Sequence, residues 1–325
     1  MVCISSITVR DSRRYHRMGL RSALLTRRAN LGDCVDARSV FRRMASNRYM
    51  GYPACVIPLT SPRRGEISAA GLALDVSRRA LLDADAMPAD AYGALIYCHA
   101  VPDERTSDST AGHLQFELGL TRANPFSVSQ AHNTALLIGL DLAAGLVEGP
   151  EAAAAVLLVA SDKLMFGAPP TRAQRMTWGD VAAAAVVSRE AQSGWKVHRV
   201  VLRHFATNFG THQRWPDGEQ RAFAAYCADA LATCLRDAGV RPGELAAIIS
   251  TAPDANFVQQ VHQSAGLPMA APGARDKARA RHAASPDLLL RLAKLQEGFA
   301  PTRPVMAWCN GNNGEFACCL LTRIA

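Results

Sequence analysis

Apolar positions along the chain recur first with helical spacing and then in short unbroken runs. Apolar residues return every three or four positions in Ala70–Leu82 and Phe223–Leu235, which predicts two amphipathic helices. The apolar runs Val156–Ala160 and Val181–Val187 predict strands buried on both faces, the second extending to Ser188. By the same criteria we expect further helices at 132–147 and 287–296, and further strands at 126–129, 305–308 and 316–322. The pattern therefore predicts alternating α and β elements.

One stretch of this pattern occurs twice. Residues 81–101 and 235–254 each read as the end of an amphipathic helix, a turn that contains Pro88 or Pro242, and a short apolar strand. With one gap the two stretches superimpose, and a repeat of this length indicates a duplicated structural unit. We therefore expect two halves, 1–190 and 191–325, each built from helices around a largely buried sheet.

Composition narrows the class of protein. A chain of 325 residues with 49% hydrophobic residues can bury a large core. Its longest apolar runs are much shorter than the roughly 20 residues of a membrane span, and the N-terminal residues lack the apolar core and cleavage site of a signal peptide. We therefore expect a cytoplasmic protein without a membrane segment. The nine cysteines lack disulfide-scaffold or metal-site spacing and are expected to be buried thiols.

Charge is unevenly distributed along the chain. The net charge is +8, residues 1–64 hold 13 arginines against three aspartates, and a second basic cluster contains Arg275, Lys277 and Arg279. Such patches favour an acidic partner, although a solvated arginine-rich surface would have the same composition. No zinc-finger, helix-turn-helix or aromatic RNA-binding pattern accompanies the charge, so nucleic acid is not an expected partner.

Four short motifs stand in a fixed order between about Gly51 and Ile324. Residues 109–120 contain S-T-A and L-G-L, residues 126–132 read F-S-V-S-Q-A-H, residues 160–162 read A-S-D, and residues 178–184 read W-G-D-V-A-A-A. Together they resemble the S-T-A…L-G-L, F-D-I-N-A-A-C, G-S-D and F-G-D-G-A-G-A motifs of ketoacyl-acyl-carrier-protein synthase III. The resemblance implies a duplicated, thiolase-type α/β fold of five layers, αβαβα. It also implies a dimer that takes acyl groups from carrier-protein or coenzyme A thioesters.

The resemblance also assigns the candidate site, where three residues depart from the family. His132 stands at the position of the family's reactive cysteine, and no cysteine lies within thirty residues of it. The family's H-Q-A-N motif reads Pro253-Asp254-Ala255-Asn256, so its histidine is absent. The asparagine of G-N-T-S-A-A-S falls on His282, and the backbone amide that completes the oxyanion hole falls on Asn312.

These residues still form an acid–base set. We expect His132, His282, Asp254 and Asn256 to be catalytic, with the backbone amides of His132 and Asn312 as oxyanion donors. Neutral imidazole accepts a proton near pH 7, and acyl transfer to a hydroxyl or amine needs such a base and oxyanion donors rather than a thiol. Structural roles are the alternatives, with His132 capping its helix and Asp254 serving as a turn or cap residue. Cys98 and Cys309 are less favoured as substitute nucleophiles.

Two functions remain open at this point. The first is a biosynthetic acyltransferase or divergent condensing enzyme that needs no metal and no permanently bound cofactor. Its substrate would be acyl-CoA or a phosphopantetheinyl carrier protein, which would dock on Arg275, Lys277 and Arg279. The second is an inactive subunit that binds or pairs with an intact, cysteine-bearing partner. Hydrolysis or decarboxylation of the thioester would use the same pocket. We expect a homodimer joined along the strand at 126–129, or a heterodimer with a synthase paralogue.

Overall fold

The computed structural model describes residues 2–11, 68–83, 87–101, 108–149, 152–163, 177–178, 180–191, 193–205, 217–252, 254–268, 281–282, 284–296, 303–311 and 313–324. Nine strands form one bent sheet in the order β3-β2-β4-β6-β1-β7-β11-β10-β8. Their bounds are β1 Val2–Asp11, β2 Tyr92–Cys98, β3 Asn124–Val128, β4 Ala155–Asp162, β6 Val181–Ser188, β7 Gly194–His204, β8 Ala247–Ser250, β10 Val305–Asn310 and β11 Glu315–Ile324. A second, two-stranded sheet pairs β5 (Thr177–Trp178) with β9 (Arg281–His282).

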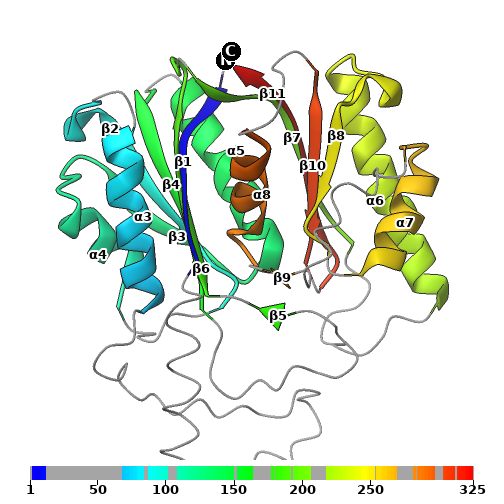
Figure 1. Cartoon of the computed structure of the whole chain (residues 1–325), viewed down its shortest axis with the longest axis horizontal. Helices are drawn as coiled ribbons and strands as arrows, with labels where there is room; N and C mark the ends of the chain where they lie inside the picture. Colours follow the sequence, from blue (N-terminus) through cyan, green and yellow to red (C-terminus); the bar gives the residue numbers. More distant parts are fainter. Residues whose placement is uncertain are drawn as a thin grey trace, which may run out of the picture.

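The large sheet bends at its middle, where β1 joins two groups of strands. β1 pairs with β6 over most of its length but with β7 only through Val2, Cys3 and Ile4. The two groups of strands therefore meet near the chain termini and face each other across a helical layer (Figure 1). The sequence pattern did not predict β1.

Helices cover both outer faces of the bent sheet and fill the space inside it. α3 (Ala69–Asp83) and α4 (Thr110–Glu117) cover one outer face, and α6 (Asp217–Asp237) and α7 (Ala255–Ser264) cover the other. α5 (Ala135–Glu148) and α8 (Asp287–Gln296) lie between the two groups of strands (Figure 1). This arrangement is the five-layer αβαβα architecture expected from the sequence, and it is confirmed.

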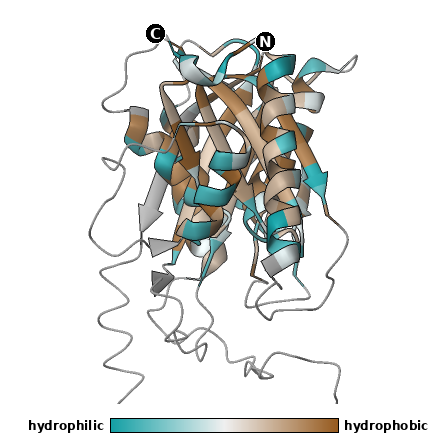
Figure 2. Cartoon of the chain, turned by 90° about the vertical axis from the view of Figure 1, so that its right-hand side faces the viewer, coloured by the Kyte–Doolittle hydropathy of each residue, from teal (hydrophilic) through white to brown (hydrophobic). Residues whose placement is uncertain are grey.

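The sequence pattern explains why the sheet is interior. Every residue of β4 and of β6 is buried, as expected for apolar strands with a helix on each face. Hydrophobic residues follow the strands, and hydrophilic residues gather on outward helix turns (Figure 2). Gly139 lets α5 approach β2, because a Cβ there would lie 2.5 Å from Cys98 Sγ. None of the described helices is long and apolar enough to cross a membrane.

The expected elements fit this structure, with one local exception. The helix expected from His132 begins as a short 3-10 helix, η2 (His132–Thr134), and becomes α-helical only at Ala135. Among the described residues, two further 3-10 turns, η1 (Ala89–Ala91) and η3 (Pro242–Glu244), precede β2 and β8. The division at residue 190 stays a prediction, and it falls between β6 and β7.

Candidate functional site

Parallel strands bring the candidate residues to one edge of the sheet. β2 runs parallel to β3 and β4, and β8 runs parallel to β10. Their carboxyl ends lie at the lower edge in Figure 1, where the chain enters η2 and α5 between the two groups of strands. Ligands of open α/β sheets bind outside the carboxyl ends of the strands. We therefore expect the functional site at this edge of the sheet.

His132 lies at this edge in an unusual backbone conformation. It follows β3 by four residues, is half-buried, and has a φ angle of 48°, while Gln130 has 60°. Left-handed φ angles are uncommon for residues with a side chain and cost free energy that neighbouring contacts must offset. Thr134 supplies one such contact, because its Oγ1 donates a hydrogen bond of 2.6 Å to the carbonyl of Ala131.

Two contacts from the C-terminal half hold the same turn. Ser285 Oγ donates to the carbonyl oxygen of His132 at 3.3 Å, and Asn133 Nδ2 donates to the carbonyl oxygen of Asn310 at 3.2 Å. Asn310 is the last residue of β10, so the turn that follows β3 also contacts the end of β10. Asn310 Oδ1 is buried and has no hydrogen-bond partner among the described residues, which leaves an acceptor beside the turn.

Asp162 is the buried carboxylate at this edge. It ends β4, is 3% exposed, and accepts hydrogen bonds from the backbone N–H groups of Ala100, Val101 and Ser285. Burial raises the pKa of Asp162, and these three donors oppose the increase. The sequence marked this residue only as the end of a strand motif, because backbone donors leave no sequence signal.

His282 is placed only through its backbone. β9 pairs with β5 so that His282 lies opposite Trp178, and its side chain lies outside the described residues. Three residues later, Ser285 contacts the carbonyl oxygen of His132. The structure thus brings the His282 segment to the His132 turn without describing a contact between the two imidazoles.

Asp254 and Asn256 occupy the start of α7. Asp254 is the N-cap: its Oδ1 accepts from the backbone N–H of Asn256 at 2.8 Å and of Phe257 at 3.4 Å. Both Asp254 and Asn256 are exposed, and no described contact joins either to the His132 turn. The cap role, left open by the sequence, is therefore observed, and a catalytic role for the two residues stays a prediction.

Four expected residues lie outside the described part of the chain. They are the oxyanion donor Asn312 and the docking residues Arg275, Lys277 and Arg279. Their roles stay predictions.

The two cysteines considered as substitute nucleophiles are poorly suited to that role. Cys98 and Cys309 are buried in the central core, and burial raises the pKa of both thiols. The neighbouring carboxylates of Asp162 and Asp287 raise them further. A thiol held in its protonated form does not attack a thioester readily.

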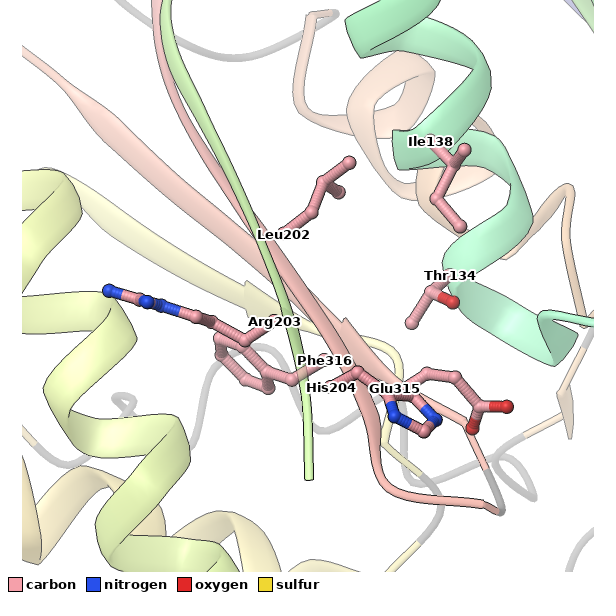
Figure 3. A pocket seen from close by; sticks show the side chains of 7 residues that line it. All are labelled: Thr134, Ile138, Leu202, Arg203, His204, Glu315 and Phe316. Carbon is pink, nitrogen blue, oxygen red and sulfur yellow. The ribbon is translucent and has the colours of Figure 1, made fainter. Parts of the chain in front are cut away.

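A pocket of about 300 Å³ opens beside η2 and the start of α5 (Figure 3). Thr134 and Ile138 form one wall, and Leu202 of β7 forms the other. His204 and Glu315, which face each other across β7 and β11, lie at one end. The Glu315 carboxylate is fixed there because it accepts a 2.8 Å hydrogen bond from the backbone N–H of Asn313. The remaining lining residues are Arg203 and Phe316. The pocket is thus mainly apolar with a polar end, and the sequence did not predict it.

Comparison with known proteins agrees with the fold. Residues 128–204, which include His132, Asp162 and the β7 wall of the pocket, match the family of 3-oxoacyl-[acyl-carrier-protein] synthase III. A search of curated proteins gives no match.

Solved structures extend the likeness over the chain. A 3-oxoacyl-(acyl-carrier-protein) synthase III is 21% identical, with a TM-score of 0.63 over 81% of this chain and 86% of its own. The acyltransferase ChlB3 is 19% identical, with a TM-score of 0.66 over 80% and 86%. OleA from Xanthomonas campestris is 15% identical, with a TM-score of 0.67 over 99% and 98%. The chain is therefore synthase III-like, with a thiolase-type fold.

Proposed function

We propose that this protein transfers an acyl group from a carrier-protein or coenzyme A thioester to a hydroxyl or amine acceptor, with His132 as general base. The observation that carries the proposal is the His132 turn. The motif resemblance aligns His132 with the nucleophile of synthase III, its backbone φ angle is 48°, and contacts from Ser285 and Asn310 hold the turn. Strained non-glycine residues concentrate at functional sites.

The proposed reaction needs one proton acceptor and donors for an oxyanion. The neutral His132 imidazole takes the proton from the acceptor O–H or N–H as its oxygen or nitrogen attacks the thioester carbonyl carbon. The backbone amides of His132 and Asn312 stabilise the tetrahedral oxyanion. When the C–S bond breaks, the leaving thiolate receives that proton from the imidazolium, so the histidine returns to its neutral form.

The pocket beside α5 supports a place for the acyl chain. Thr134 belongs to the same short helix as His132, and the apolar walls of Ile138 and Leu202 suit a hydrocarbon chain. Replacing either wall residue with Trp fills part of the pocket, and we expect it to shift preference toward shorter acyl groups.

Partner proteins form part of the proposal. β3 lies at one end of the sheet order, and the adjacent α5 exposes Leu142 (44%) and Leu146 (40%) one turn apart. An open strand edge beside an apolar helix face favours pairing with a second copy. A monomer in sedimentation at micromolar concentration would contradict a homodimer. The carrier protein is proposed to dock on Arg275, Lys277 and Arg279.

The test combines acylation assays with two replacements of His132. Purified protein is mixed with acyl-carrier and acyl-CoA thioesters and with amines or alcohols, and products are identified by mass spectrometry. We expect transfer, and we expect His132→Ala and His132→Asn to reduce it by about 10²-fold or more with thioester affinity unchanged. Asparagine tolerates left-handed φ, so it removes the base with less backbone strain.

His113→Ala is the matched control, because His113 is exposed on α4, which covers an outer face of the sheet, whereas α5 lies in the inner layer. Unchanged transfer in both His132 variants would overturn the base role. If the wild-type protein transfers nothing alone but stimulates an intact synthase, the inactive-subunit function replaces this proposal. His132→Cys offers a further check: we expect the thiol to be acylated while condensation stays negligible, because the family's histidine partner is absent.

A further inference from the structure

One buried carboxylate connects three separate segments around the His132 turn. Asp162 Oδ1 accepts from Ala100 N at 2.8 Å and from Val101 N at 2.9 Å, just beyond the end of β2. Asp162 Oδ2 accepts from Ser285 N at 2.8 Å, just before α8. Because backbone N–H groups occupy both oxygens, the carboxylate holds the backbone of these segments in place.

The connection continues from Ser285 to His132. The Ser285 side chain donates to the His132 carbonyl oxygen, so its N–H binds Asp162 and its Oγ binds the turn. Ser285 is 1% exposed, which protects both bonds from water. Ser285 therefore links the Asp162 carboxylate to the backbone of His132.

Both ends of this connection are conformationally strained. Ala284, next to Ser285, has a φ angle of 49°, and His132 has 48°. Alanine gains nothing locally from a left-handed conformation, so the surrounding contacts must hold it there. A carboxylate that accepts several N–H bonds supplies strong, directional contacts of this kind.

We propose that Asp162 is a positioning residue for His132, acting through Ser285 to fix the turn that carries the imidazole. The expected effect of Asp162 on activity rests on the proposed function, whereas its expected effect on the position of the His132 imidazole does not. A change at residue 162 thus reaches the imidazole through two hydrogen bonds and without contact to substrate. Misplacement of a catalytic group by about 1 Å costs on the order of 10²-fold in rate.

The first readout does not require activity. Proteins labelled with ¹³C in histidine give an imidazole signal for His132, assigned by its loss in His132→Asn. We expect Asp162→Asn to shift that signal and to leave the His113 signal unchanged. Asparagine replaces one acceptor oxygen with an NH₂ group that cannot accept from Ser285 N–H. An unshifted His132 signal in folded Asp162→Asn protein would overturn the proposal, even if the protein transfers no acyl group.

The second readout is a mutant cycle on acyl transfer. We expect Asp162→Asn to lower kcat by about 10²-fold with KM within about twofold, and to have no further effect in a His132→Asn background. Equal losses in both backgrounds would indicate a general structural role and contradict the proposal. Asp141→Asn, on the exposed face of α5, is the control.

Ser285→Ala provides a second test that applies even if the Asp162→Asn protein does not fold. It keeps the backbone N–H that binds Asp162 and removes the hydroxyl, which binds the His132 carbonyl and also interacts with the Asp162 carboxylate. We expect a smaller shift of the same His132 signal and a loss of several-fold in kcat, restored by Ser285→Thr. No shift with Ser285→Ala would remove the link between Asp162 and His132.

Discussion

The two outer layers of the molecule share an architecture but are packed with different residues. The first outer core, between α3, α4 and the strands β2, β4 and β6, holds seven alanines in the described part of the chain. The second outer core, between α6, α7 and the strands β7, β10 and β11, holds two alanines with three cysteines and four large aromatic residues. Small side chains thus fill much of the first core beside Tyr92 and Tyr97, whereas larger side chains fill most of the second. Added side-chain volume should therefore destabilise the first core, and lost side-chain volume should destabilise the second.

The largest expected effect is the loss of Trp308. This residue is fully buried, packs edge-on against Phe257 and tilted against Phe316, and donates a hydrogen bond to His262. Trp308→Ala leaves a cavity and an unpaired imidazole acceptor, so we expect a loss of about 3–5 kcal/mol in the free energy of unfolding. Urea titration measures it. Phe116→Ala, at a side chain that is 80% exposed, is the control and should lie within about 0.5 kcal/mol of wild type.

A medium effect is expected from added volume in the first outer core. Ala184 is fully buried on β6 and belongs to the same cluster as Leu72 and Val76 of α3. Ala184→Leu should cost about 1–3 kcal/mol, because the added methyl groups have no space. Ala225→Leu, on the exposed face of α6, should leave the urea midpoint almost unchanged. If Ala184→Leu were as stable as wild type, the packing contrast between the layers would be wrong.

The smallest effect concerns pH and belongs to the second outer core alone. His262 is 1% exposed, its Nε2 accepts from Trp308 Nε1 at 3.2 Å, and burial lowers its pKa. A histidine whose folded pKa lies below its unfolded value of about 6.5 stabilises the fold above that value. This contribution is lost as pH falls through the folded pKa.

Replacing His262 by Asn, whose Oδ1 can still accept from Trp308, isolates this term. We expect the stability of wild type relative to His262→Asn to fall as the pH decreases below about 6.5 and to be flat above about pH 7.5. His113→Asn should show no such trend, because His113 is exposed. A constant difference across this range would contradict a buried neutral imidazole.

The sequence predicted the strongly patterned elements and missed those defined by distant partners. The continuous apolar runs of β4 and β6 were recognisable because both faces of these strands are buried. β7 was missed because its outer half is exposed and mixes basic and apolar residues. β1 was missed because its strand identity depends on β6 and β7, whose paired residues lie at least 170 positions further along the chain.

The candidate site shows the same limit. Motif order placed His132, but the residues that hold its turn act through backbone groups, which have no sequence pattern. The hydrogen bonds of Ser285 and Asn133 to carbonyl oxygens, and those of Asp162 to N–H groups, are of this kind. Conversely, a visible carboxylate at Asp254 proved to cap a helix. Side-chain identity alone does not separate these roles.

The pairing of β1 has a consequence for the order in which the protein folds during synthesis. β1 is made well before its main partner, β6, because about 170 residues separate the paired residues Asp11 and Val181. At roughly 5–20 residues per second, the strand waits on the order of ten to thirty seconds for that partner. During this interval its backbone N–H and C=O groups have neither β6 nor β7 to bind. Nascent chains halted before β6 should therefore depend on chaperones, and chains extended past β7 should not.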